Sequence, residues 1–339
     1  MKRIILHIGS PKTGTTTIQR SLFRSREQPH GFTYPDLNTG QNKLTAHHHL
    51  LLLLKAHDEL PRRMRYLFTG SRYSRTVEDT KAKLREELQN ADNIVLSSEY
   101  LFSMRDRHIA ALKDILTECG VDEILICLYV REPAAYYASI VQEACKGTGP
   151  FPQPDSFRYP IKDVIERWSA HFDGQVAVRG FHRDLLANGD VFTDFVTFSS
   201  QHFGVTKPAI EPLSENQSIS IEALMLLDRY RARFHPTQAS TVTRDIDVLV
   251  GHLQKLGAAS YTKVALKPNV SDLIYANHEP ALTWLKDRFG IDFTRSQVRA
   301  PDPLKTPLDM EDIFVTSTQS EPSSLVLDLV HRLVAEARG

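Results

Sequence analysis

The stretch that decides the fold of this chain is 3–17, which reads RIILHIGSPKTGTTT. Its first part, 3–8, is a short run of β-branched and apolar residues that predicts a buried strand, and the Gly-Ser-Pro that follows is a turn signal. From Thr15 to Arg26, apolar residues recur at helical spacing, which predicts a helix with one apolar face. The chain therefore opens as strand, glycine-containing loop and helix.

The same alternation continues to about residue 205. Apolar runs predict strands at 93–97, 123–130 and 175–181. Helical spacing predicts helices at 45–60, 78–90, 107–119, 133–146, 161–172 and 191–203, with 61–78 irregular and 147–160 a mobile loop or lid. Beyond Pro212 the pattern predicts helices alone, at 219–234, 241–256, 271–289 and 322–338. Alternating strands and helices imply an α/β fold, a mostly parallel sheet and a ligand at the carboxyl ends of its strands.

We therefore expect two parts. Residues 1–212 form an α/β core in which 27–78 and 147–160 are insertions on the acceptor side. Residues 213–339 form a helical C-terminal extension that packs on this core. The 339 residues are 41% hydrophobic and 24% charged, so the chain is able to bury a sizeable core.

Charge and cysteine content exclude several classes of protein. Lys+Arg and Asp+Glu both number 41, whereas proteins that coat DNA or membrane surfaces need a net basic field. Three cysteines are too few for a disulfide framework or a thiolate zinc site. The apolar runs at 4–8 and 50–54 are far shorter than the ~20 residues of a membrane helix. We expect a cytoplasmic protein with no nucleic-acid partner and no integral membrane segment, and the sequence leaves its oligomeric state open.

The loop at 9–17 predicts a binding site for an oxyanion. A helix N-terminus presents unpaired N–H groups, Gly14 allows close backbone approach, and Lys12 adds a positive charge. A Walker A loop reads G-x-x-x-x-G-K-[ST]; Gly9 and Gly14 have its separation, but Thr15 stands at the lysine position. The predicted strand at 93–97 also runs into Ser98-Glu99 and not into an aspartate that holds magnesium. A simpler interpretation is a turn that only caps the helix.

Two motifs together resemble sulfotransferases that use 3′-phosphoadenosine 5′-phosphosulfate (PAPS), in particular bacterial members of the carbohydrate type. One is PKTGTT at 11–16, similar to the loop that holds the donor's phosphosulfate. The other is VREPAAYYAS at 130–139, in which Ser139 follows Arg131 by eight residues. The likeness spans roughly 3–205. It implies a P-loop-NTPase-like central parallel sheet flanked by helices, with PAPS as donor, PAP as product and no metal.

The resemblance also assigns residues to the donor. The phosphosulfate would be held by Pro11, Lys12, Thr13, Gly14, Thr15, Thr16 and Thr17. Arg131 and Ser139 would hold the 3′-phosphate, and an arginine at the end of a strand suits this role because guanidinium binds phosphate in a bidentate manner. The chain departs from cytosolic members at two points: Thr17 stands where they have a tryptophan, and no Arg-Lys-Gly triplet follows residue 212.

Sulfuryl transfer is an in-line displacement, so catalysis needs positioning and electrostatic stabilisation. We expect Lys12 to stabilise the leaving phosphate and Glu99 to act as general base, since a carboxylate lies at this edge in carbohydrate sulfotransferases. His48, or its neighbour His47, is the rival base, and the simpler interpretation of both is a solvated helix start. A metal site at 47–49 is disfavoured because adjacent helical residues point about 100° apart.

The sequence thus predicts a sulfotransferase that acts on a hydroxyl, with a small-molecule, saccharide or glycolipid acceptor. Two alternatives stay open. A P-loop nucleotide kinase or NTPase would need magnesium and ATP. A non-catalytic anion-binding protein would bind the same ligands without turnover.

Overall fold

The computed structural model of the chain describes residues 1–28, 31–39, 43–68, 72–148, 151–211, 219–236, 243–256, 263–294 and 307–316, together with a few positions between 326 and 335. It divides into two compact units. The first comprises Met1–Arg131, Pro160–Ser214 and Phe289–Ile291. The second comprises Glu132–Tyr159, Glu215–Arg288 and Asp292–Gly339.

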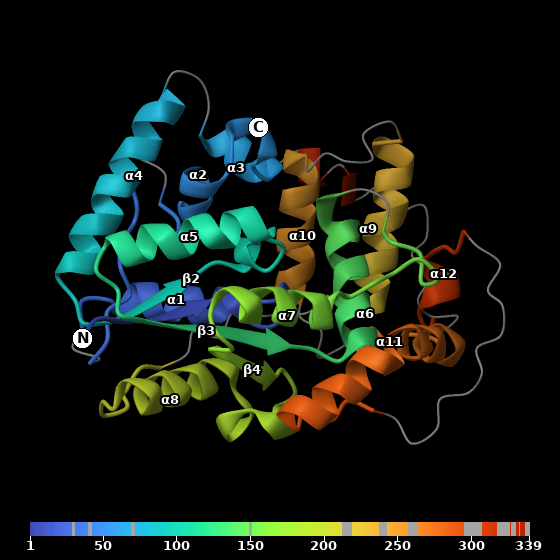
Figure 1. Cartoon of the computed structure of the whole chain (residues 1–339). Helices are drawn as coiled ribbons and strands as arrows, with labels where there is room; N and C mark the ends of the chain where they lie inside the picture. The colour runs from blue at the N-terminus through green and yellow to red at the C-terminus, as the bar shows by residue number, and fades with distance from the viewer. Residues whose placement is uncertain are drawn as a thin grey trace. The chain divides into compact units, whose positions relative to one another are not determined.

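A parallel four-stranded sheet forms the centre of the first unit (Figure 1). Its strands are β1 (Arg3–His7), β2 (Asn93–Ser97), β3 (Glu123–Val130) and β4 (Val176–Gly180), in the order β2-β1-β3-β4. The predicted α/β class with a parallel sheet is confirmed, and each strand was predicted to within one residue. The chain moves from β1 outward to β2 and then returns to β3 on the other side of β1. In sheets of this order, ligands bind at the carboxyl ends of the two neighbouring strands from which the chain leaves in opposite directions, which here are β1 and β3.

Helices flank the sheet on both faces. Alternate residues of a strand point to opposite faces, and the face that carries Ile5, Val95 and Tyr129 packs against α1 (Thr15–Ser25) and α8 (Val191–Phe203). The residues that bury this core from the helices include Ile18, Leu22, Phe192 and Phe195. On the other side of the sheet from α8 lies α5 (Asp106–Glu118), which packs against α7 (Ile161–His171) (Figure 1).

The second unit is built from helices. They are α6 (Pro133–Glu143), α9 (Ile221–Phe234), α10 (Arg244–Leu256), most of α11 (Pro268–Phe289) and α12 (Met310–Ile313). Most of the helix predicted at 322–338 lies outside the described residues. None of the described helices combines the length and apolar character that crossing a bilayer requires.

The segment between β1 and β2 differs from prediction. Only Leu50–Leu54 (α2) is α-helical within 45–60, because the backbone N–H of His47 donates to the Ser97 carbonyl (2.8 Å) and so belongs to the end of β2. The predicted irregular stretch 61–78 is wrong, since α3 (Arg62–Leu67) and the start of α4 (Arg72–Gln89) occupy it. Helix α4 buries Thr80, Leu84 and Leu88 on one face, and the described side chains of its first turns, at 73–79, add no buried residue that the sequence pattern could have signalled.

The stretch 151–160, within the predicted mobile loop, is anchored inside the second unit. The Tyr137 hydroxyl donates to the Pro152 carbonyl (2.9 Å), and the Tyr159 N–H donates to Nε2 of His278 (2.9 Å). Phe157 and Tyr159 are both buried, and the Tyr159 ring stacks on Tyr136. These contacts hold the stretch in place; its role on the acceptor side stays a prediction.

Candidate active site

The loop between β1 and α1 has the backbone that anion binding needs. Gly9 and Gly14 have φ of 74° and Lys12 has φ of 63°, and loops that mix left- and right-handed residues direct successive N–H groups to one side. The Thr13 hydroxyl closes the turn by donating to the Ser10 carbonyl (2.6 Å). Gly14 is the N-cap of α1, and no described side chain caps the helix at this residue. A helix end without a side-chain cap is suited to an anionic ligand, and the binding of one here stays a prediction.

Glycine is required at both ends of this loop. A Cβ on Gly9 would lie 2.9 Å from Cα of Glu99, and a Cβ on Gly14 would lie 2.6 Å from Cγ1 of Val191. Both distances are too short for a real side chain. The loop therefore presses directly against the end of β2 and the start of α8, which fixes its position above the sheet.

Arg131 lies beside this loop. It follows the last residue of β3, and its Nη1 donates to the carbonyl oxygen of Lys12 (3.0 Å). Its guanidinium lies over the ring of Phe181, 5.5 Å from the ring centre. The Lys12 loop and Arg131, which are far apart in the sequence, thus meet at the carboxyl ends of β1 and β3. The predicted threonines divide by exposure: Thr13, Thr15 and Thr17 are buried, and Thr16 is exposed.

Ser139 belongs to the second unit, in α6. Its hydroxyl donates to the Ala135 carbonyl one turn earlier (3.0 Å). The same helix begins at Pro133, and the side chain of Glu132 caps it by accepting from the N–H groups of Ala134 and Ala135. Glu132 therefore has a structural role, and the joint action of Ser139 and Arg131 stays a prediction.

Glu99 lies directly after β2, at the first position of a short 3₁₀ turn, Glu99–Leu101. Its carboxylate is partly exposed and its two oxygens have different neighbours. Oε2 accepts a hydrogen bond from Nε2 of Gln19 (2.8 Å), and Oε1 lies 3.6 Å from Nε2 of His48. The structure thus brings together two of the predicted catalytic residues, Glu99 and His48.

The histidines at 47–49 divide into structural and accessible groups. His47 is buried, its Nδ1 accepts from the Ser97 N–H (2.8 Å), and its Nε2 bonds the Pro35 carbonyl (2.8 Å). Burial lowers the pKa of His47 to about 3, so the ring stays neutral, and both of its nitrogens are occupied. His49 is also buried, and burial lowers its pKa to about 4. His48 keeps partial solvent access, and its Nδ1 lies 2.8 Å from the Ser98 hydroxyl.

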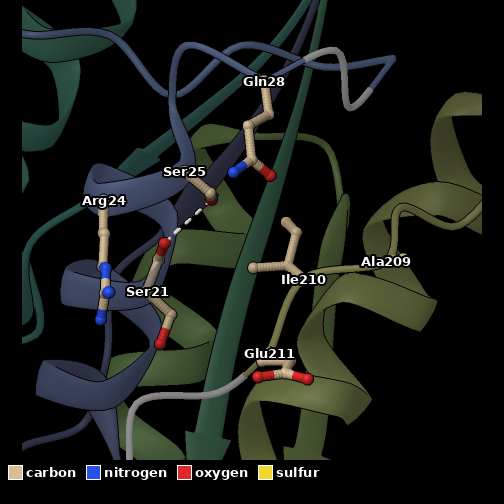
Figure 2. Close-up of a pocket in the computed structure, with 7 residues that line it drawn as sticks. All are labelled: Ser21, Arg24, Ser25, Gln28, Ala209, Ile210 and Glu211. Atoms are coloured by element: carbon tan, nitrogen blue, oxygen red, sulfur yellow. Dashed lines mark hydrogen bonds between the residues drawn. The ribbon is translucent and has the colours of Figure 1, made fainter.

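A cavity of about 370 Å³ lies away from this site, at the C-terminal end of α1 (Figure 2). Side chains from the end of α1 face the segment Ala209–Glu211 across it, and a hydrogen bond joins Ser25 to Ser21 in its wall. It includes none of the predicted site residues. Within the part of the chain that the structure describes, no three His, Cys, Asp or Glu side chains are arranged to hold a metal ion.

Sequence reasoning missed Gln19. Its side chain is 3% exposed and bonds both Glu99 and Ser97, although it lies in the middle of a helix. The available signal is its position beside Ile18 and one turn before Leu22, on the buried side of the helix, where a polar residue needs a partner.

No family model, curated protein or solved structure matches this chain. The fold and the site define an α/β protein with a loop suited to an anion at the centre of its sheet. The case for a particular activity therefore depends on the residues around this loop.

Proposed function

We propose that this chain is a PAPS-dependent sulfotransferase with a P-loop-NTPase-like core. The observation that carries the proposal is the hydrogen bond from Arg131 to the Lys12 carbonyl, which joins the anion-binding loop to a guanidinium at the end of β3. PAPS carries a phosphosulfate at one end and a second phosphate on its ribose. A loop and an adjacent guanidinium suit these two anionic ends.

The sheet supports a P-loop-like core. Thr33 forms a parallel bridge to Ile94, and its N–H donates to the Asn93 carbonyl (2.8 Å). This short segment adds a fifth parallel partner outside β2. With it, β1 and its loop have two neighbours on either side, so the phosphate-binding loop starts from the central strand.

In this proposal the loop of 11–17 binds the phosphosulfate and Arg131, with Ser139, binds the 3′-phosphate. The acceptor oxygen forms a bond to sulfur as the bond from sulfur to the bridging phosphate oxygen breaks. The electron pair of that bond goes to the phosphate of PAP, where Lys12 stabilises the charge. The acceptor proton goes to Glu99, and His48 lies next to the same carboxylate.

The acceptor is a hydroxyl compound, and a saccharide or glycolipid fits the resemblance to carbohydrate-type members. A transferred sulfuryl group carries less charge than a phosphoryl group. A lysine and backbone N–H groups therefore suffice for its transfer, and the proposal includes no metal.

Thermal-shift titration tests the proposal. PAP without metal should raise the melting temperature, ADP should raise it far less, and Lys12→Ala should fold but lose transfer of labelled sulfate from PAPS. Stabilisation by ATP with magnesium that exceeds stabilisation by PAP would instead indicate a nucleotide kinase or NTPase. Binding of PAP without turnover on any acceptor would indicate a non-catalytic anion-binding protein.

A further inference from the structure

Gln19 connects the anion-binding helix to the proposed base. Its Nε2 lies 2.8 Å from Oε2 of Glu99 and 3.2 Å from Oγ of Ser97. We propose that Gln19 is a positioning residue that holds Oε2 of Glu99 and so presents Oε1 to the acceptor's proton. This inference rests on the proposed function, because it deepens the role of Glu99 as base.

The direction of the Gln19 amide is fixed by its partners. An ionised carboxylate only accepts hydrogen bonds, so the NH₂ group of Gln19 must face Glu99, and its second hydrogen goes to the Ser97 hydroxyl. The Ser97 hydroxyl in turn lies 2.8 Å from Nδ1 of His7, whose ring stays neutral because burial lowers its pKa to about 3. In either tautomer of His7 the Ser97 oxygen keeps a lone pair for the Gln19 amide, so this amide can donate to both Ser97 and Glu99.

The same helix binds the donor in the proposed function. Gln19 lies one turn after Thr15, on the same side of α1. A Cβ built on Gly9 would lie 3.2 Å from Cγ2 of Thr15 and 2.9 Å from Cα of Glu99, so loop, helix and base are in contact. Gln19 therefore fixes the carboxylate relative to the loop that would hold the sulfuryl group.

The second oxygen of Glu99, Oε1, is the one that Gln19 does not bond. Oε1 lies 3.6 Å from Nε2 of His48, and the Glu99 charge also helps, after burial, to raise the pKa of the Tyr34 hydroxyl. Tyr34 is buried and its hydroxyl donates to the Thr45 carbonyl (2.7 Å), so it does not compete for Oε1. Of these two neighbours, His48 is the one that keeps partial solvent access.

Two variants of similar size test the role of the amide donors. Gln19→Met removes both hydrogens, and we expect kcat for sulfuryl transfer from PAPS to fall about tenfold to a hundredfold, the range for one hydrogen bond to a charged group. The KM for PAPS should stay within about twofold, since the loop is untouched. Gln19→Glu donates only while it is protonated. Its kcat should therefore approach the wild-type value over the pH range in which the two facing carboxyl groups share one proton, and it should fall above this range as the second carboxyl group ionises.

A packing role makes a different prediction, namely equal kcat for Gln19→Met and Gln19→Glu at every pH. That result, or wild-type kcat in Gln19→Met, overturns the proposal. Gln28→Met, an exposed position just beyond α1, is the matched control and should leave kcat unchanged. If Gln19→Met does not fold, Ser97→Ala removes the second anchor and should lower kcat without altering the KM for PAPS.

A crystal structure of Gln19→Met separates this inference from the proposed function. Loss of a fixed Glu99 orientation in the variant supports the positioning role, and an unchanged carboxylate overturns it, whether or not the protein transfers sulfate. Absence of PAP binding and of transfer to a panel of aryl glycosides, with the wild-type protein, counts against the proposed function alone.

Discussion

Lys12 has an unfavourable backbone conformation. Its φ of 63° is left-handed, which costs a non-glycine residue about 1–2 kcal/mol. Such strain is typical of functional sites. We expect it here if the ammonium group of Lys12 serves the donor, as proposed.

Lys12→Gly should separate these two effects. Glycine removes the strain but adds about 0.5–1 kcal/mol of backbone entropy cost, so the free energy of unfolding should stay within about 1 kcal/mol of wild type. Transfer from PAPS should fall about a hundredfold to a thousandfold with the loss of charge. Urea unfolding and labelled-sulfate assays measure the two, with Lys12→Ala as a control that keeps the strain. Unfolding of Lys12→Gly alone would contradict this account.

Arg131 is the second residue on which the donor assignment depends. A lysine at this position keeps the charge but loses the planar pair of donors that suits a phosphate. Arg131→Lys should therefore weaken PAP binding about tenfold to a hundredfold and leave the weaker ADP binding unchanged, because ADP has no 3′-phosphate. Calorimetry with both nucleotides measures the difference, and Arg20→Lys on the exposed side of α1 is the control. Equal losses for PAP and ADP would exclude the 3′-phosphate role.

At the scale of elements, the strands and the segment after β1 show where sequence reasoning works and where it does not. Unbroken apolar runs predict the strands because both faces of a parallel sheet are buried. The helix expected at 45–60 is cut short because the backbone and the ring of His47 both bond to the backbone of Ser97. A tertiary contact of this kind has no local signal in the sequence.

The candidate site divides in the same way. The loop and Arg131 could be singled out from the sequence because glycine, lysine and a strand-end arginine stand at characteristic positions in the chain. The contact of Gln19 with Glu99 could not be predicted, because it joins positions eighty residues apart through the packing of α1 against β2. Only the three-dimensional structure gives that pairing.

His47 and His48 are adjacent, and we expect their substitution by alanine to have different effects. His47→Ala should lower the free energy of unfolding by about 2–4 kcal/mol, because it leaves a cavity and removes the ring's bonds to the Ser97 N–H and the Pro35 carbonyl. His48→Ala should leave stability within about 1 kcal/mol, since its ring is partly exposed, and should reduce transfer from PAPS. Denaturant unfolding and turnover of both variants measure this. The reverse pattern would make His47 the functional residue.

Helix α8 is tied to the sheet by one buried carboxylate. Asp194 accepts two hydrogen bonds from Arg179 of β4 (2.6 and 2.7 Å) and one from the Tyr129 hydroxyl of β3 (2.7 Å). Burial acts to raise the pKa of Asp194, but these hydrogen bonds outweigh burial and hold the pKa below its usual value. The carboxylate therefore stabilises the fold above about pH 4, the value for an unfolded aspartate, and this contribution is lost as the pH falls further.

Asp194→Asn should lower the free energy of unfolding at pH 7 by about 3–5 kcal/mol, because it leaves the Arg179 charge half-buried without its partner. The variant should also lose less stability than wild type between pH 4 and pH 2, since the titrating carboxylate is gone. Urea unfolding across this range measures both effects. Parallel pH curves for the two proteins would show that Asp194 does not titrate with unfolding.

For the whole molecule, buried neutral histidines set the response to acid. Burial lowers the pKa of His7 and of His47 to about 3 and that of His49 to about 4. An unfolded histidine has a pKa of about 6.5, so between that value and the folded one the unfolded chain binds protons that the folded chain does not. Stability is then complete above about pH 6.5 and falls as the pH decreases.

Each such histidine contributes about 1.4 kcal/mol per pH unit well inside this window, so the three together should lower the free energy of unfolding by about 4 kcal/mol per unit near pH 5. His49→Phe tests the assignment, because the ring already packs edge-on against Phe68 and neither of its nitrogens bonds a described residue. The variant should be at least as stable as wild type at pH 7 and should lose about 1.4 kcal/mol less between pH 5.5 and pH 4.5. Unfolding in urea at a series of pH values gives both slopes. If the slopes are equal, His49 takes up its proton in the folded protein and contributes nothing to acid sensitivity.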